Sequence, residues 1–155
     1  MALAEVLTDL ESKIGTEIYV SDWVTITQEM INEFAKATGD HQWIHTNPER
    51  AARESPYRTT IAHGYFTLSL YPLMRGLVDE SRPLFPSVRS IINYGINKLR
   101  FPNAVPVGSR IRIRSKLAGI ENIKNSLQLT EEFSVEIEGQ VRPGCVAECV
   151  MRLYF

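Results

Sequence analysis

The sequence predicts an α+β fold in which a curved antiparallel sheet wraps around a central helix. The second half of the 155-residue chain carries long runs of alternating apolar and polar residues, the period of a strand with one buried face. Nearly every position from 65 to 78 is apolar or small, which is typical of a buried helix. Short connections between the strands favour antiparallel pairing, and the buried helix would cover their apolar face. We expect residues 1–155 to form one domain.

The first half of the chain is predicted to consist mainly of helices and loops. Apolar residues at helical spacing indicate amphipathic helices, and suitable end residues flank them. Thr27 and Asn47 are suited to cap helix N-termini, and Gly15 and Gly39 are suited to end helices. The expected elements are helices over 3–13, 27–39 and 48–54, a short edge strand over 18–24 and a loop over 39–46.

The central helix and the strands follow. Pro72 falls inside the apolar stretch that Gly64 opens, and it should kink or weaken that helix. We expect a bend at Gly95 and turns at or near Gly119 and Gly139. The expected strands cover 88–94 with a continuation over 97–101, then 110–117, 127–137 and 145–155.

The composition excludes several classes of function. A net charge of −1, with basic residues spread along the chain, argues against a nucleic-acid partner or a polybasic membrane anchor. No apolar run approaches the ~20 residues of a membrane-spanning helix, and the N-terminus lacks a signal-peptide pattern. Cys145 and Cys149 fit as small apolar residues in a reducing compartment, and no further cysteine completes a metal site. We therefore expect a cytoplasmic protein.

The first candidate site is the loop that holds Asp40 and His45. A carboxylate and an imidazole held close together can orient one water and move its protons. Loops on rigid scaffolds often carry such pairs. The structural alternative is that Asp40 caps a neighbouring element and His45 packs against Trp43.

The second candidate is the pair His63 and Gly64 at the start of the central helix. A helix N-terminus presents free backbone N–H groups, and glycine lets a ligand approach them closely. Such a site would stabilise negative charge on a thioester carbonyl. Alternatively, Gly64 permits close packing and His63 is a hydrogen-bonded structural residue. Ser69 lies in the same helix without a neighbouring base, and the chain has no phosphate-binding loop or nucleophile elbow.

These motifs together resemble those of the MaoC-like (R)-specific enoyl-CoA hydratases, most of all the nodulation-protein-N-like branch. The resemblance covers roughly residues 15 to 155. Several motifs in the same order and at matching spacing identify a family more specifically than any single motif. The segments that carry it are 37–45, 47–52, 61–64, 93–102 and 105–108.

The resemblance implies a hot-dog fold that works as a homodimer in fatty acid metabolism. It implies Asp40 and His45 as the catalytic dyad, and Gly64, with His63 and Gln42, as the oxyanion and substrate-binding group. Gln42 and Trp43 depart from the Asn-Pro of many relatives, but the Gln42 amide could still touch the water or the substrate. Further candidates are Ser69, as a hydroxyl on the central helix, and Lys98 or Arg100, for the phosphates of coenzyme A.

The implied reaction is reversible hydration of a trans-2-enoyl thioester, carried by coenzyme A or acyl carrier protein, to the (R)-3-hydroxyacyl thioester. It needs no metal and no redox cofactor. One alternative is a thioesterase on the same fold, although residues 65–78 lack the carboxylate that this chemistry would use. Another is a non-catalytic acyl-binding protein, in which Asp40 and His45 would be replaceable.

Overall fold

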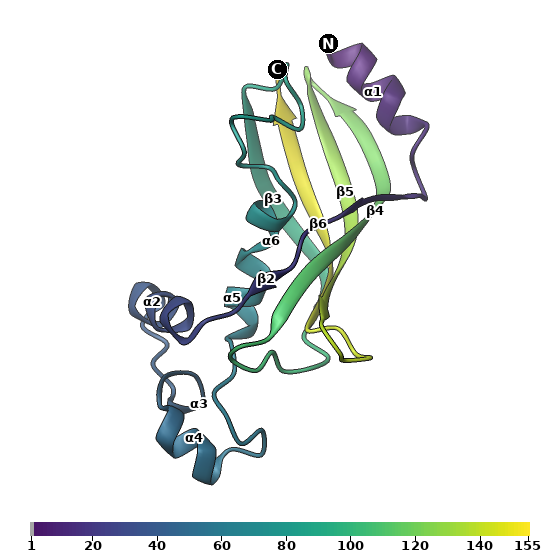
Figure 1. Ribbon diagram of the computed structural model, residues 1–155. Coiled ribbons are helices and arrows are strands. Elements are labelled where there is room, and N and C mark those ends of the chain that lie inside the picture. The colour runs from purple at the N-terminus through teal and green to yellow at the C-terminus, as the bar shows by residue number, and fades with distance from the viewer. Residues whose placement is uncertain (1) are drawn as a thin grey trace.

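The computed structural model describes residues 2–155 and confirms the predicted class (Figure 1). One antiparallel sheet contains the strands in the order β1–β4–β5–β6–β3, and β2 also pairs with β4. Its long strands are twisted and curved, and α5 and α6 lie alongside them (Figure 1). The strands are β1 Glu17–Val20, β2 Val24–Thr25, β3 Ser90–Arg100, β4 Arg110–Ile123, β5 Ser126–Ile137 and β6 Cys145–Tyr154.

The helices gather in three places around this sheet. In Figure 1, α1 lies near both chain ends at one end of the long strands, and α2, α3 and α4 cluster at the opposite end. No helix in residues 2–155 is long and apolar enough to cross a membrane. The helices are α1 Leu3–Glu11, α2 Gln28–Thr38, α3 Trp43–Thr46, α4 Pro48–Glu54, α5 Gly64–Ser69 and α6 Tyr71–Met74.

The predicted helix ends around α2 and α4 are confirmed. Thr27 Oγ1 accepts a hydrogen bond from the Met30 N–H at 3.2 Å, and Asn47 Oδ1 accepts one from the Arg50 N–H at 2.9 Å. Gly39 ends α2 at φ 82°, in the left-handed region that glycine enters without strain. The first helix is shorter than predicted, because it stops at Glu11 instead of continuing to residue 13.

The central helix is broken, as Pro72 predicted, but only one of its sides is buried. α5 and α6 are separate short helices that meet at Leu70. Phe66 and Met74 are buried, whereas Tyr65 is 69% exposed and Leu73 is 55% exposed. The prediction of burial on nearly all sides is therefore wrong for the single chain. The sheet covers one side, and apolar residues remain uncovered on the other.

Two predicted strand boundaries also need correction. Gly119 is not at a turn, because β4 continues to Ile123 and shifts its register between Leu117 and Gly119. The turn comes at Lys124 and Asn125, which both have positive φ, as a two-residue hairpin loop requires. The bend expected at Gly95 appears as a register shift within an uninterrupted β3. The turn near Gly139 is confirmed by its φ of 77°.

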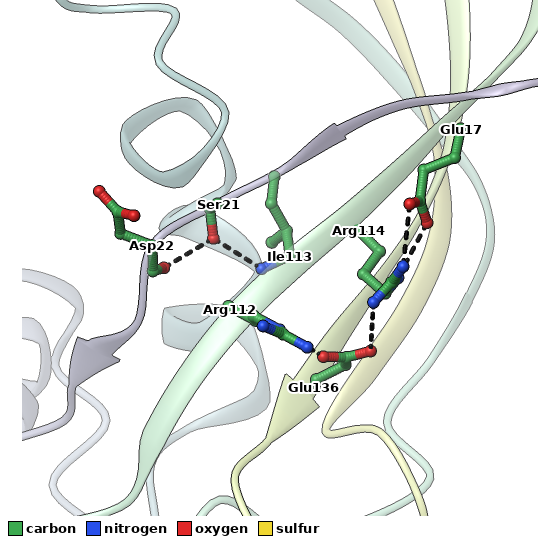
Figure 2. Close-up of polar contacts among 7 residues, drawn as sticks. All are labelled: Glu17, Ser21, Asp22, Arg112, Ile113, Arg114 and Glu136. Atoms are coloured by element: carbon green, nitrogen blue, oxygen red, sulfur yellow. Dashed lines mark hydrogen bonds and ion pairs between the residues drawn. The ribbon is translucent and has the colours of Figure 1, made fainter.

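The strand expected over 18–24 is divided into β1 and β2, and Ser21 bridges the interval. The Ser21 N–H donates to the Ile113 carbonyl at 3.0 Å. The Ser21 hydroxyl accepts from the Ile113 N–H at 2.9 Å (Figure 2). Figure 2 also shows Arg114 between Glu17 and Glu136 on the outer face of the sheet. The arginine-rich side of β4 is thus a partly solvated face of cross-strand ion pairs.

An ion pair lies in the core between the sheet and the central helices. Glu131 of β5 is fully buried and receives hydrogen bonds from Arg75 Nε at 2.9 Å and Arg75 Nη2 at 3.0 Å. The Tyr71 hydroxyl donates to the same carboxylate at 2.5 Å. Burial, followed by the Glu131 charge, raises the pKa of the Tyr71 phenol, so this hydroxyl remains a donor.

Candidate active site

His45 lies on α3, a helix of four residues inside the segment that we expected to be a loop. Its side chain is buried, and its Nδ1 lies 2.7 Å from the Ile61 carbonyl oxygen. Because a carbonyl oxygen can only accept, Nδ1 carries the hydrogen of this bond. The other ring nitrogen, Nε2, is then left with a lone pair when the ring is neutral.

Several hydrogen bonds fix the position of α3. The Gln28 side-chain amide donates to the His45 carbonyl at 2.7 Å, and the Thr60 hydroxyl donates to the Gln28 side-chain oxygen at 2.5 Å. The Ile61 N–H donates to the Ile44 carbonyl at 3.0 Å. The segment of Thr60 and Ile61 therefore holds both the backbone of α3 and the His45 ring. Preorganisation of this kind is what a catalytic group needs.

His63 joins the second half of the site to the first. Its Nε2 donates to the Asp40 backbone carbonyl at 2.9 Å, and its ring stacks on His45 with centroids 3.9 Å apart. The half-buried Asp40 accepts the Gln42 N–H at 3.4 Å through Oδ1. Asp40 offers a carboxylate oxygen, and His45 and His63 each offer a ring nitrogen, as possible ligand atoms. One such atom from each residue lies within 4.8 Å of the others. These atoms are therefore close enough together for one small ligand, such as a water, to contact more than one of them.

The surroundings of His45 favour its neutral form. Burial is the largest cause that lowers its pKa below 6.5, and His63 lowers it further. The Ile61 hydrogen bond and the Asp40 charge raise the pKa of His45, but by less than burial and His63 lower it. His45 is therefore available as a proton acceptor near neutral pH.

Gly64 and His45 line the same cavity, of about 210 Å³, between α5 and the loop that follows β3. Gly64 is the first residue of α5, so its N–H has no partner within the helix. A Cβ at this position would lie 2.8 Å from the Phe101 ring. The absence of a side chain thus allows both the close approach of Phe101 and access to the backbone N–H.

Thr67 is a site residue that sequence reasoning missed. It lines the same cavity, and its buried hydroxyl has no hydrogen-bond partner among residues 2–155. The signal in the sequence was its place three residues after Gly64, on the same helix face. Ser69, the hydroxyl that we had singled out, instead donates to the Phe66 carbonyl at 2.7 Å and is exposed.

Asp40 and His63 are not among the residues that line this cavity, and the remaining candidates also lie outside it. Gln42 is exposed, and its backbone carbonyl accepts the His45 N–H at 3.0 Å. Its side-chain amide does not line the cavity. Lys98 pairs with Glu148 at 3.1 Å, and Arg100 donates to the Leu99 carbonyl at 2.7 Å. Both cations are on the surface, so a role toward phosphates stays a prediction.

The donor atoms of Asp40, His45 and His63 would also suit a metal ion. They are the one such group in the described part of the chain. The expectation that the reaction needs no metal therefore remains to be tested by chelation.

Comparison with known proteins shows the family of the chain. The model of the MaoC like domain matches residues 9–138. The chain belongs to the MaoC-like family. It is 50% identical over 153 residues to 3-hydroxyacyl-thioester dehydratase Z of Mycobacterium tuberculosis, covering 98% of each protein. It is 41% identical over 150 residues to Nodulation protein N of Rhizobium leguminosarum bv. viciae, covering 96% of this chain and 91% of that protein.

A solved structure supports the fold of this MaoC-like chain. The R-hydratase PhaJ1 from Pseudomonas aeruginosa superimposes with a TM-score of 0.67, covering 91% of this chain and 81% of the other at 18% identity. The curved antiparallel sheet with its central helices is therefore the hot-dog fold of the MaoC-like hydratases, and the predicted resemblance is confirmed.

Proposed function

We propose that this MaoC-like chain catalyses the reversible hydration of a trans-2-enoyl thioester, carried by coenzyme A, to the (R)-3-hydroxyacyl thioester. The observation that carries the proposal is the buried His45, which lines the same cavity as Gly64 and whose bond from Nδ1 to the Ile61 carbonyl leaves a lone pair on Nε2. A dehydratase acting on 3-hydroxyacyl thioesters among the relatives supports the substrate class. We place the reaction in the cytoplasm, where the unpaired Cys145 and Cys149 would stay reduced.

Asp40 and His45 would hold the attacking water between them. As the water oxygen bonds to the β-carbon, His45 Nε2 takes one of its protons. The proton that His45 has taken is then passed to the α-carbon on the same side, with Asp40 taking part in the transfer, so that both residues return to their starting state. The water thus supplies both the hydroxyl group and the new hydrogen of the product.

The Gly64 N–H would receive the thioester carbonyl oxygen. Addition to the β-carbon moves electron density onto that oxygen, so a donor placed there stabilises the transition state. His63 would act indirectly, by fixing the Asp40 backbone and the plane of the His45 ring. The Thr67 hydroxyl offers a further hydrogen bond to the bound acyl group or to the water.

The thioesterase alternative lacks a side chain for its chemistry. Neither α5 nor α6 contains an aspartate or glutamate, so no carboxylate from the central helices faces the cavity. The acyl-binding alternative does not explain the free Nε2 beside a carboxylate. Measurements with dyad variants, argued in the Discussion, separate it from an enzyme.

The direct test is the absorbance of the enoyl-thioester band of crotonyl-CoA. We expect the band to decay with the protein, without release of thiol, and at the same rate after treatment with excess EDTA. Thiol release would identify a thioesterase. Loss of activity with EDTA, restored by a divalent metal ion, would show that the Asp40, His45 and His63 group works through a metal.

The pH dependence should report the shifted His45. Because the pKa of His45 is below 6.5, kcat/KM should stay level through neutral pH and fall only under acidic conditions, where the imidazole becomes protonated. The measurement is the initial rate at saturating and low crotonyl-CoA between about pH 4.5 and 8. An inflection above 6.5 would contradict a buried, neutral base.

Gly64→Ala should lower kcat/KM by about 10²-fold, because its methyl group would displace the thioester carbonyl and the Phe101 ring. The double variant Gly64→Ala/Phe101→Leu separates the two causes, since Phe101 is partly exposed and can be shortened. If the double variant recovers wild-type activity, Gly64 serves packing alone. If activity stays low, close approach of the substrate is what requires glycine.

We also propose a homodimer formed through β3. This strand ends the sheet with one edge unpaired, and Ile92, Tyr94 and Ile96 are exposed on it. Pairing with a second β3 would continue the sheet and cover these side chains. Ile96→Lys should convert dimers to monomers in light scattering, whereas Val141→Lys, at a fully exposed loop residue, should not. A monomeric wild type would contradict the proposal.

A further inference from the structure

A second pocket lies at the end of the molecule opposite to the candidate active site. It is bounded by α1, by β1 and by the segment after α6 that contains Leu84 and Phe85, and its volume is about 370 Å³. Figure 1 shows α1 at one end of the sheet and α3, which carries His45, at the other. This volume is within the range of small-molecule sites.

One buried hydrogen-bond donor of a residue that lines this pocket is unused. Arg75 lines the pocket and is 3% exposed, and its Nε and Nη2 bind Glu131. Its Nη1 is buried and has no partner among residues 2–155. The guanidinium also lies over the Tyr19 ring, with Cζ 4.7 Å from the centroid. A buried donor without a partner has lost its hydrogen bonds to water, which costs free energy. A ligand oxygen bound to Nη1 would remove that cost.

The walls and charges of the pocket define what such a ligand would be. Val6, Leu10, Ile18 and Phe85 give it an apolar lining. Each charged group that lines it already has a partner: Lys13 binds Asp9 at 2.7 Å, Glu17 binds Arg114 at 2.8 Å, and Arg75 binds Glu131. A carboxylate would bring an additional, uncompensated charge beside Glu131, whereas a neutral oxygen would not.

We propose that this pocket is a second ligand site for an uncharged aliphatic molecule that carries a carbonyl oxygen. The oxygen accepts from Arg75 Nη1, and the aliphatic part packs against α1 and Phe85. At about 30 Å³ for each non-hydrogen atom, the pocket holds roughly a dozen such atoms. Neutral amides, esters and thioesters of medium-chain acids have this chemistry. The site is independent of the proposed hydration reaction.

The test is an NMR titration of the full chain with octanamide and, separately, with octanoate. We expect saturable shifts of amide signals around Leu10, Ile18 and Phe85, with octanoate binding at least about tenfold more weakly. Arg75→Lys keeps a cation for Glu131 but removes Nη1, so octanamide should bind about tenfold more weakly, as expected for a lost bond to a charged donor. Leu84→Glu, at a partly exposed lining residue, should weaken binding as well.

Val141→Glu is the matched control, because it adds the same charge at a fully exposed residue outside the pocket. It should leave octanamide binding unchanged. The proposal is overturned if the shifts do not saturate, or if they centre on His45 and Gly64. It is equally overturned if Arg75→Lys binds as well as the wild type, or if octanoate binds as tightly as octanamide.

Discussion

Replacing His45 with glutamine is expected to slow hydration of crotonyl-CoA by about 10²- to 10⁴-fold, the contribution of a positioned general base. The glutamine amide can still donate to the Ile61 carbonyl, which His45 Nδ1 does at 2.7 Å. The backbone of α3 also keeps its bond from Gln28. The fold and the cavity should therefore survive, while the base at Nε2 is lost.

Asp40→Asn should produce a comparable loss, because the amide keeps the size of the side chain but not its charge. Two residues that act on one water work as a unit, so the double variant should be little slower than either single variant. His41→Gln is the matched control, since His41 is an exposed histidine in the same segment. Its rate should equal that of the wild type.

The measurement is the initial rate of enoyl-band decay, with thiol release followed in parallel. It shows whether Asp40 and His45 are catalytic. Full activity in both His45→Gln and Asp40→Asn would remove the dyad from the mechanism. An inactive wild type that binds crotonyl-CoA with unchanged affinity in both variants would instead support the acyl-binding alternative. A rate loss in His41→Gln as large as in His45→Gln would point to a general disturbance of the loop.

The sheet could be predicted because its alternation is long and regular, while its irregularities could not. The row of β5 that includes Leu127, Leu129 and Phe133 is buried as its period indicates. Gly119 misled us because a glycine within a strand can mark a register shift as well as a turn. α3 was missed because four residues are too few to show a helical period.

The site was only partly visible for a related reason. Asp40, His45 and Gly64 sit in ordered local motifs, so sequence alone could propose them. The bond from His63 to the Asp40 carbonyl spans 23 residues, and no local sequence pattern predicts it. Thr67 and Ser69 are two positions apart on α5 and so point to nearly opposite sides of it, and the choice between them depends on which side faces the cavity. Tertiary packing decided both points.

Glu131→Ala should destabilise the protein by about 3–5 kcal/mol, the usual result of breaking a buried ion pair. Glu131 occupies an inward position of β5 between apolar neighbours, and it is fully buried. Its removal leaves the Arg75 guanidinium without a counter-charge and the Tyr71 hydroxyl without its acceptor. Urea unfolding of each variant at the same protomer concentration compares their free energies of unfolding under one contribution from oligomerisation.

Two further variants show whether the loss comes from an uncompensated charge. Glu138→Ala breaks the exposed pair with Arg110, whose side chains are about half exposed, and it should cost less than about 1 kcal/mol. Arg75→Met/Glu131→Leu replaces both buried ions with apolar groups of similar size, and it should recover most of the stability lost in Glu131→Ala. If the double variant is as unstable as Glu131→Ala, the cause is packing and not charge. If Glu131→Ala costs no more than Glu138→Ala, water must reach Arg75, and the core around Tyr71 is not dry.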